Sequence, residues 1–359
     1  METGEGFDKY LAEQMAIINS KLEEYLSNKA SDQFIEKILG RAIYEYDKEA
    51  INKAVLEPSW YLLNSGGKRW RPVLMLLIIE ALGKKREEYI EFSIIPEIIH
   101  NATLVHDDIE DRSETRRGKP SVHIKFGEDI AVNLGDFLYY FPIVALLDSK
   151  KLTLESKNRI LSVYTREMLR VATGQATDIA WHNFLVPLES INEEKYLQMV
   201  YNKTGVLARM ACKMGAILGG ANDEEVEKLG HFGATIGVAF QLQDDLLNIT
   251  PSTLAEKKGG LGDDITEGKI TLMVIDTMQR ASQEDKKRLL DILKMHTTDQ
   301  NIINEAIRII DKYGSKKYAK KRSIEIVKEA WSGIESLLPD SEAKSRIKDL
   351  TEFLISRSL

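Results

Sequence analysis

Apolar residues recur every three or four positions along most of this chain. In the stretch 7–26, apolar side chains stand at Leu11, Met15, Ile18, Leu22 and Leu26. That spacing places them on one face of an α-helix. The same periodicity predicts helices within residues 74–82, 95–105, 130–147, 152–168, 196–218, 226–247, 303–310 and 324–338.

Strand-like alternation of apolar and polar residues is nearly absent. The only candidate, residues 121–126, is too short to carry a sheet. Short polar turns join the predicted helices, and no linker rich in proline or serine divides the chain. We therefore expect an all-α fold in which residues 1–359 form a single-domain antiparallel helical bundle around a central cavity.

The composition argues against several classes of protein. The 359 residues include 49 Lys and Arg against 56 Asp and Glu, a net charge of −7, and this acidity argues against a nucleic-acid partner. The lone cysteine, Cys212, rules out a disulfide framework and a cysteine-based zinc site. Apolar runs such as 73–79 are too short to span a bilayer, and residues 1–8 do not resemble a signal peptide. We expect a cytoplasmic protein with no stable membrane anchor.

Two acidic clusters each follow directly after a long apolar stretch. The first comprises Asp107, Asp108 and Asp111, and the second comprises Asp244, Asp245 and Asn248. Residues four apart share a helix face, so each cluster gathers oxygen atoms of the kind that Mg²⁺ prefers as ligands. A single acidic run is as readily a solvated helix end. Two matched clusters at the C-terminal ends of helices, where the helix dipole disfavours negative charge, indicate cation sites.

Basic residues gather at a few points of this acidic chain. Gly66 and Gly67 precede Lys68 and Arg71 at a predicted helix start, where backbone N–H groups favour an anion. Further basic residues are Arg116, Arg117, Lys203, Lys257, Lys258 and Lys269. Any one of them alone is more often a surface charge. Beside two carboxylate clusters, the basic sets indicate two phosphorylated substrates, only one of them bound through metal.

Taken in order, these residues resemble the motifs of the trans-isoprenyl diphosphate synthase, or polyprenyl synthetase, family. The family's GGKRxRP stretch matches residues 66–72, and its first DDxxD motif with a following arginine pair matches 107–117. Its Lys-Thr pair matches 203–204, and its FQxxDDxxD motif matches 240–248. The resemblance covers about residues 60–280, is of the geranylgeranyl diphosphate synthase kind, and implies an isoprenoid synthase-like helical fold.

The resemblance implies that isopentenyl diphosphate condenses head to tail with an allylic diphosphate. It assigns the isopentenyl diphosphate to Lys68, Arg71, His100 and Arg117. It assigns the allylic diphosphate to Arg116, Lys203, Lys258 and Lys269.

The resemblance also implies Mg²⁺ as the cofactor, three ions with bound diphosphate. The implied metal residues are Asp107, Asp111 and Asp244, with Asp108, Asp245 and Asn248 supporting them. The residues it places in catalysis are Asp107, Lys203, Thr204, Gln241 and Asp244, and Gln175 and Asp178 look like the family's mid-chain polar pair near the metals.

Two positions depart from the family pattern. Asn248 stands where many members have Asp, which removes one charge but keeps an oxygen, so we still expect activity. The family commonly has a lysine ten residues before the position of Lys269, where this chain has Gly259, and Lys258 lies one residue upstream of that glycine.

The residues below the first acidic cluster predict the product length. On a helix, Thr103 and Ile99 lie one and two turns before Asp107, with Ala102 beside them, and none of the three is aromatic. In the family, an aromatic residue four or five positions before the first Asp blocks the growing tail early. We expect a shaft open past farnesyl and a geranylgeranyl or longer product. The floor of the shaft is either set by the aromatic residues Phe137, Tyr139, Tyr140 and Phe141, or those residues are ordinary core.

Three other functions compete with this interpretation. A class I terpene cyclase shares the first acidic motif, yet it has no need of a second phosphate site such as Lys68, Arg71 and His100, and a head-to-head synthase is disfavoured for similar reasons. A non-catalytic regulatory subunit tends to lose one acidic motif, whereas this chain keeps both apart from Asn248. The resemblance also implies a homodimer.

Overall fold

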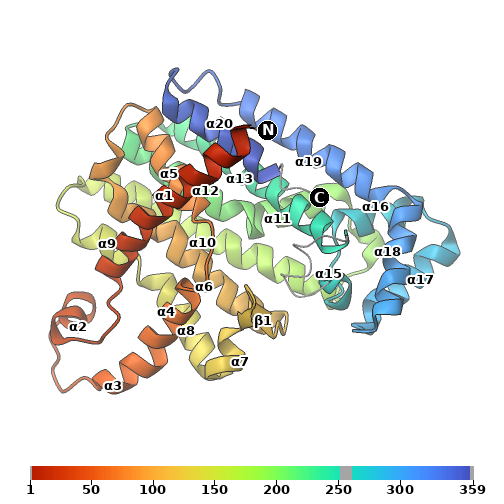
Figure 1. Cartoon of the computed structure of the whole chain (residues 1–359), viewed down its shortest axis with the longest axis horizontal. Helices are drawn as coiled ribbons and strands as arrows, with labels where there is room; N and C mark the ends of the chain where they lie inside the picture. The colour runs from red at the N-terminus through yellow and green to blue at the C-terminus, as the bar shows by residue number, and fades with distance from the viewer. Residues whose placement is uncertain (1, 251–260, 356–359) are drawn as a thin grey trace. The chain divides into compact units, whose positions relative to one another are not determined.

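Helices make up nearly all the regular structure of the computed structural model, which describes residues 2–250 and 261–355 (Figure 1). In these two ranges the only strands are β1 (Thr115–Arg116) and β2 (Lys119–Pro120), two residues each. The predicted all-α fold is therefore confirmed.

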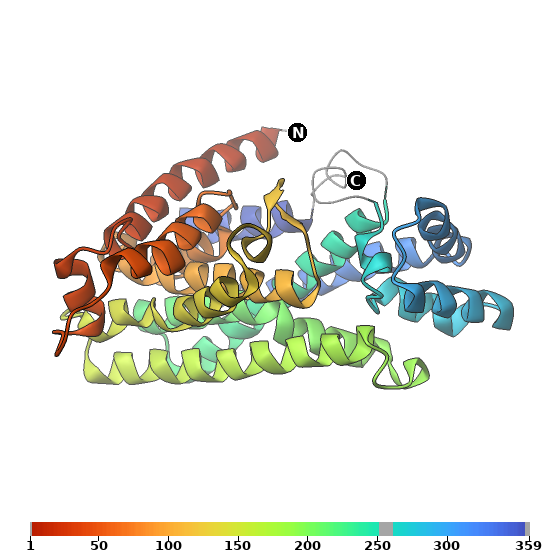
Figure 2. The same ribbon diagram turned by 90° about the horizontal axis from the view of Figure 1, so that it is seen from below.

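The chain divides into two compact units. The first unit comprises Met1–Ser162, Met214–Asn222 and Asp340–Ile347, and the second comprises Val163–Lys213, Asp223–Pro339 and Lys348–Leu359. Three helices contain residues of both units: α10 (Leu154–His182), α12 (Gly205–Gly219) and α20 (Glu342–Ile355). The helix α10 comprises 29 residues and is the long helix at the lower edge of Figure 2.

The first unit holds the N-terminal helices and the first acidic cluster. Its helices are α1 (Glu2–Tyr25), α2 (Asp32–Leu39), α3 (Lys48–Ile51), α4 (Glu57–Leu63), α5 (Trp70–Ala81), α6 (Ile94–Glu110), α7 (Val122–Phe126), α8 (Glu128–Tyr140) and α9 (Ile143–Asp148), with a π-helix at Asn52–Leu56 and 3-10 turns at Arg86–Glu88 and Ile90–Ser93. The helix α5 is apolar on all sides and almost wholly buried, as expected of a central helix.

The helix α6 packs along α8 at very short range. Gly135 of α8 lies directly beneath the His106 ring of α6, and a side chain at this glycine would overlap that ring. The His106 Nδ1 atom is 3.1 Å from the Tyr139 hydroxyl. His106 thus packs between two helices.

One expected helix in this unit is wrong in detail, and the one stretch named as a strand candidate is helical. Residues 130–147 are not one helix, because α8 ends before Phe141 and Pro142 and α9 begins after them. The strand-like stretch 121–126 is mostly the short helix α7, in which Val122 alone is buried. The apolar pattern shows neither the break at Pro142 nor the helical conformation of residues 122–126.

By length and composition, one segment of the described chain could cross a membrane. It is Glu128–Asp148, of which the most apolar window is 44% buried. The segment is broken at Pro142 and packs on α6. A core helix of a soluble protein has the same composition, so the segment does not by itself indicate a membrane span.

The second unit holds the Lys-Thr pair and the second acidic cluster. Its helices are α11 (Glu193–Lys203), α13 (Asp223–Asn248), α15 (Asp263–Thr266), α16 (Leu272–Arg280), α17 (Gln283–Met295), α18 (Gln300–Lys312) and α19 (Ser315–Ser332), with a 3-10 turn at Leu188–Ser190. The helices α13 and α19 lie side by side (Figure 1). Gln243 of α13 donates a buried 2.9 Å hydrogen bond to Ser323 of α19.

Small residues let α10, α11, α12 and α13 approach closely at positions within the second unit. A Cβ atom at Gly237 of α13 would lie 2.6 Å from the Gly205 Cα atom, and one at Gly174 of α10 would lie 2.5 Å from the Lys203 backbone nitrogen. Distances this short exclude any side chain. The predicted helix 196–218 is broken here, at Thr204 between α11 and α12. The Lys-Thr pair therefore lies at a helix junction held between α10 and α13.

Candidate active site

The first acidic cluster lies at the C-terminal end of α6. Asp107 and Asp108 are in its last turn, and Asp111 is the C-cap residue, whose N–H donates to the Asp107 carbonyl at 2.8 Å. Asp108 is buried, and its Oδ1 accepts hydrogen bonds from the Arg116 guanidinium, one of them 2.7 Å long. Burial raises the pKa of Asp108, which the charge of Arg116 opposes. The Asp107 Oδ2 atom also lies 3.6 Å from the Arg116 Nη2 atom.

A short β-hairpin positions the two arginines that follow this cluster. Arg116 pairs with Lys119 across the antiparallel ladder, which leaves Arg117 and Gly118 as a two-residue turn. Both turn residues have positive φ, 55° and 75°, as in the type I′ turn that suits a tight hairpin. The hairpin directs Arg116 back to Asp108 and directs Arg117 to the loop before α5.

The loop before α5 contacts Arg117 through its glycines. The Arg117 Nη1 atom donates to the Gly66 carbonyl. Gly67 has φ of 118°, and a Cβ at this position would lie 3.1 Å from the Arg117 guanidinium. Both the backbone angle and the space therefore favour glycine here. Beyond the loop, the buried Arg71 lies over the Trp70 ring at 4.5 Å, and Lys68 lies 3.6 Å from Asp8.

His100 lies among arginines in the first unit. Its own desolvation and the positive charges of Arg71, Arg117, Arg69 and Arg116 lower its pKa well below the usual value of a histidine. Burial also lowers the pKa of Arg117. The positive charges of Arg71 and Arg117 therefore act on His100, and these are three of the four residues expected to bind isopentenyl diphosphate. Their mutual repulsion marks a place where an anion would be stabilised.

In the second unit, the Lys-Thr pair bonds to α10 and α13. The Lys203 Nζ atom donates to Asp178 at 2.5 Å, and the Thr204 hydroxyl donates to the Gln241 side-chain oxygen at 2.9 Å. Burial would raise the pKa of Asp178, but the charges of Lys203 and Lys269 hold it below its usual value. The close approach at Gly174, one turn before Asp178, makes this ion pair possible.

Asp245 of the second cluster is buried and accepts two side-chain hydrogen bonds. The Tyr196 hydroxyl donates to its Oδ2 at 2.6 Å, and the Gln241 amide donates to its Oδ1 at 2.8 Å. Burial raises the pKa of Asp245 to about 6. Thr204, Gln241, Asp245 and Tyr196 thus form one chain of hydrogen bonds. These bonds suit Asp245 to a supporting position more than to direct metal binding.

The side chain of Asn248 is engaged by the backbone of α15. Its Oδ1 accepts the Asp264 N–H at 3.1 Å, and its main-chain carbonyl accepts the Gly262 N–H at 2.8 Å. Asp264 is a half-buried residue whose carboxyl pKa is raised well above its usual value by desolvation, with the charge of Asp245 adding to the shift. Lys269 forms an ion pair with Glu267 and moderates the pKa of Asp264. In this geometry Asn248 anchors the segment that carries Asp264.

The carboxylates fit Mg²⁺, although they do not form a complete cage. Among residues 7–250 and 261–354, no group of three or more His, Cys, Asp or Glu side chains is arranged as a metal site. Mg²⁺ binds through one or two carboxylates and takes the rest of its ligands from water and phosphates, so a partial donor set is what it needs. The buried Oδ2 of Asp108 has no hydrogen-bond partner, which fits a cluster designed for a cation.

The sequence did not indicate two residues that contact the second cluster. Tyr196 stands seven residues, about two helical turns, before Lys203, so helical spacing could have identified it. Asp264 follows Asp263 in a glycine-containing stretch, with no apolar helix before it to mark it. Lys258 lies outside the described residues, so its expected phosphate contact stays a prediction.

The residues expected to set product length lie on α6. Ile99 and Ala102 are fully buried, and the Thr103 hydroxyl donates to the His100 carbonyl at 2.8 Å. The four aromatic residues suggested as a floor do not act as one group. Phe137 stacks on Phe141, Tyr139 lies beside His106, and Tyr140 is 74% exposed. Tyr140 therefore cannot close a shaft inside this chain.

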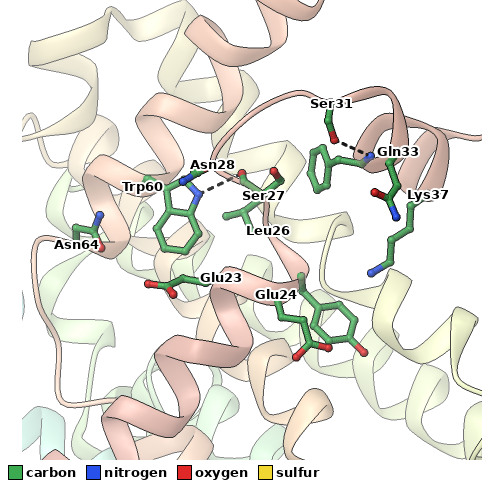
Figure 3. A pocket seen from close by; sticks show the side chains of 12 residues that line it. Glu23, Glu24, Leu26, Ser27, Asn28, Ser31, Gln33, Lys37, Trp60 and Asn64 are labelled. Atoms are coloured by element: carbon green, nitrogen blue, oxygen red, sulfur yellow. Dashed lines mark hydrogen bonds between the residues drawn. The ribbon is translucent and has the colours of Figure 1, made fainter.

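A separate cavity of about 550 Å³ opens between α1, α2 and α4. Figure 3 shows its polar rim of Glu23, Glu24 and Lys37, with the Trp60 indole donating to the Ser27 carbonyl at 3.2 Å. Its lining includes none of the residues of the motifs. The cavity is therefore distinct from the candidate active site.

Helices that carry carboxylates beside clustered arginines and lysines define a class of enzyme that handles diphosphates with a metal ion. Comparison with known proteins gives the family. The polyprenyl synthetase family model matches residues 52–310. A short chain isoprenyl diphosphate synthase of Methanothermobacter thermautotrophicus is 35% identical over 85% of this chain and 91% of its own.

Two further relatives match over nearly the whole length. The geranylgeranyl diphosphate synthase of Sulfolobus acidocaldarius is 30% identical over 98% of both chains. The crystal structure of a geranylgeranyl pyrophosphate synthetase from Pyrococcus horikoshii matches with a TM-score of 0.83 and 30% identity over 99% of both chains. The chain belongs to the polyprenyl synthetase family and is a trans-prenyltransferase.

The raised pKa of Asp245 predicts a pH-dependent stability of the metal-free protein. Its folded-state value of about 6 exceeds the usual value of an Asp near 4, so the native state holds the proton more tightly than the unfolded chain. The stabilisation from this proton is complete below about pH 4 and is lost as the pH rises through about 6. We expect Asp245→Asn to stabilise the metal-free protein at neutral pH by about 1–3 kcal/mol.

Thermal unfolding in the presence of a chelator checks this. The gap between the unfolding midpoints of variant and wild type should widen from about pH 4.5 to about pH 8. Asp148→Asn, at an exposed carboxylate, is the control and should show no such change. Parallel curves for Asp245→Asn and wild type would contradict the assignment.

Proposed function

We propose that this enzyme is a cytoplasmic geranylgeranyl diphosphate synthase. It joins isopentenyl diphosphate to allylic diphosphates, in trans and with Mg²⁺, until the chain has twenty carbons. The relatives named geranylgeranyl diphosphate synthase, from two archaea, support this product. The small, buried Ala102 below the first acidic cluster supports a tail longer than farnesyl.

The cation cluster of the first unit supports an isopentenyl diphosphate site. Desolvation and, after it, the positive charges of nearby arginines lower the pKa of His100, and a bound diphosphate would balance those charges. Lys68, Arg71, His100 and Arg117 bind this diphosphate in our proposal. This is the observation that carries the proposed function, because a terpene cyclase has one diphosphate substrate and needs no such site.

The carboxylate clusters and the remaining cations bind the allylic diphosphate. Asp107, Asp111 and Asp244 would hold the Mg²⁺ ions, three in our proposal, and Arg116, Lys203 and Lys269 would contact the same diphosphate. Bound Mg²⁺ would supply positive charge that favours departure of the diphosphate. Asp178 holds the Lys203 ammonium in place through their 2.5 Å ion pair.

The reaction breaks one bond and forms another. The allylic C–O bond ionises, and Lys203 and Arg116 stabilise the charge that develops on the diphosphate. The double bond of isopentenyl diphosphate then attacks the allylic carbon, and a proton leaves to the released diphosphate. Thr204 and Gln241 present oxygens that stabilise the cationic carbon, and their 2.9 Å hydrogen bond fixes both side chains.

Product analysis tests this function directly. The purified protein is incubated with Mg²⁺, isopentenyl diphosphate and, in separate reactions, dimethylallyl, geranyl or farnesyl diphosphate. We expect geranylgeranyl diphosphate from all three primers. Lys68→Gln should raise KM for isopentenyl diphosphate about tenfold and leave KM for the primer unchanged, because it removes one charged hydrogen bond. No condensation by folded protein would favour the regulatory subunit instead.

Ala102 provides the test of product length. A phenyl ring at this position would occupy space about one turn below Asp107. We expect Ala102→Phe to shorten the main product from geranylgeranyl to farnesyl diphosphate. Leu104→Phe is the control, because two residues turn the helix about 200° and place its ring on the opposite face. An unchanged product from a folded Ala102→Phe variant would show that the tail takes another path.

An exposed apolar surface of the first unit supports the homodimer that we propose. Val132 and Tyr140 lie two turns apart on α8 and are 46% and 74% exposed. Leu147 and Leu154 add to the exposed apolar residues that follow α8 in sequence. A surface that gathered these side chains would suit contact with another protein.

Light scattering after size-exclusion chromatography tests the dimer. The wild type should have twice the mass of the chain, and the double variant Val132→Glu with Tyr140→Glu should have the mass of one chain, because buried carboxylates at an apolar interface are costly. Leu185→Glu, at an exposed leucine of the second unit, should remain dimeric. A monomeric wild type would refute the dimer.

A further inference from the structure

Arg69 stands inside the GGKRxRP stretch, between residues that we expect to bind diphosphate, and its side chain is buried. The Arg69 side chain is 3% exposed, whereas the neighbouring Lys68 side chain is 47% exposed. Its φ of 49° is in the left-handed region, and the two glycines before Lys68 also have positive φ. A non-glycine residue keeps such a conformation only where the surroundings impose it.

The guanidinium of Arg69 joins three helices of the first unit. Its Nη1 donates to Glu97 of α6 at 2.5 Å, and its Nη2 donates to the carbonyl of Leu63, the last residue of α4, at 2.7 Å. Its Nε donates to the Asn19 side chain of α1 at 3.3 Å. These bonds hold the loop from both sides, because Leu63 precedes it and Arg69 ends it.

Glu97 is the anionic partner of Arg69 in a buried ion pair. It is 2% exposed, and its Oε1 accepts from the Asn101 amide at 2.8 Å as well as from Arg69. Glu97 lies one helical turn before His100 on α6. The ion pair therefore connects the loop that carries Lys68 to the helix that carries His100.

A buried ion pair is a weak source of stability, because desolvation of both charges offsets their attraction. Apolar residues of similar volume serve as well in many cores. What the pair supplies is a fixed geometry, since the planar guanidinium bonds only to acceptors that match its shape. Such geometry matters where several cations must converge on one small anion.

We propose that Arg69 and Glu97 are positioning residues for the diphosphate of isopentenyl diphosphate. Arg69 does not touch the substrate. It fixes the left-handed end of the loop so that Lys68 and Arg71 stand at a set distance from His100. This inference rests on the proposed function, which assigns those three residues to that substrate.

The decisive experiment uses a charge-neutral double variant. Arg69→Met alone leaves the Glu97 carboxylate buried without its cation, and this variant should unfold at a lower temperature. Arg69→Met with Glu97→Gln removes both charges and keeps the acceptor for Asn101. We expect the double variant to recover the unfolding temperature and still to show KM for isopentenyl diphosphate raised about tenfold or more. Its KM for the allylic primer and its kcat should stay within about threefold of wild type.

A second buried ion pair is the matched control. Arg209 donates to Glu167 at 2.8 Å in the second unit, and both side chains are buried. Arg209→Met with Glu167→Gln should leave KM for isopentenyl diphosphate unchanged. Arg69→Lys keeps the charge without the guanidinium fork, and its KM should lie between wild type and the double variant.

The outcomes separate this inference from the proposed function. A stable Arg69 and Glu97 double variant with wild-type KM for isopentenyl diphosphate would overturn the positioning role. The same raised KM in the Arg209 and Glu167 control would also overturn it, because the effect would then be one of general stability. If Lys68→Gln and His100→Gln leave that KM unchanged, the proposed substrate site itself fails.

Discussion

The ion pair between Arg116 and Asp108 holds the first half of the candidate site together. Asp108 is buried at the C-terminal end of a helix, where both the low dielectric and the helix dipole disfavour a negative charge. Arg116 makes that charge tolerable. Because Arg116 and Arg117 are neighbours at a hairpin turn, the same pair directs Arg117 to the glycine loop. The position of the first acidic cluster and the direction of Arg117 thus both depend on the contact between Arg116 and Asp108.

In the second unit, close packing of helices, instead of a hairpin, positions the polar side chains of the candidate site. There, glycines bring backbones close enough for short side chains to bond between helices. Lys203 meets Asp178, and Thr204 meets Gln241, because α10 and α13 approach the junction of α11 and α12. Each of these four side chains forms a hydrogen bond or ion pair with another side chain of the protein. Side chains ordered in this way lose little further freedom when a substrate binds.

The apolar periodicity predicts the helical class well and the helix ends poorly. Residues 226–247 lie within α13, because a long buried face leaves only one solution. The apolar pattern hides the break at Pro142, because apolar residues continue on both sides of it. The stretch 121–126 alternates like a strand, yet it forms a helical turn beside the hairpin. The apolar pattern within one segment carries no information about the elements that pack beside it.

The site was predicted more fully where residues are adjacent in sequence. Asp107 to Asp111 and Lys203 with Thr204 are short motifs, and the structure places each at a helix end or junction. Tyr196 shares a face of α11 with Lys203, so spacing alone hints at it, whereas Asp264 approaches Asp245 through the packing of α15 on α13, which no spacing within one helix shows. The ion pair of Arg69 with Glu97 spans 28 residues and is equally hidden.

The positive φ angles of Gly66, Gly67 and Arg69 have a consequence for the energetics of turnover. Glycines give the unfolded chain more conformations to lose, and a left-handed arginine adds strain, so this loop makes folding less favourable. That entropy is lost once, when the chain folds, and is not lost again in each catalytic cycle. An enzyme that must capture a small, highly charged molecule many times per lifetime gains from a loop whose ordering is already complete.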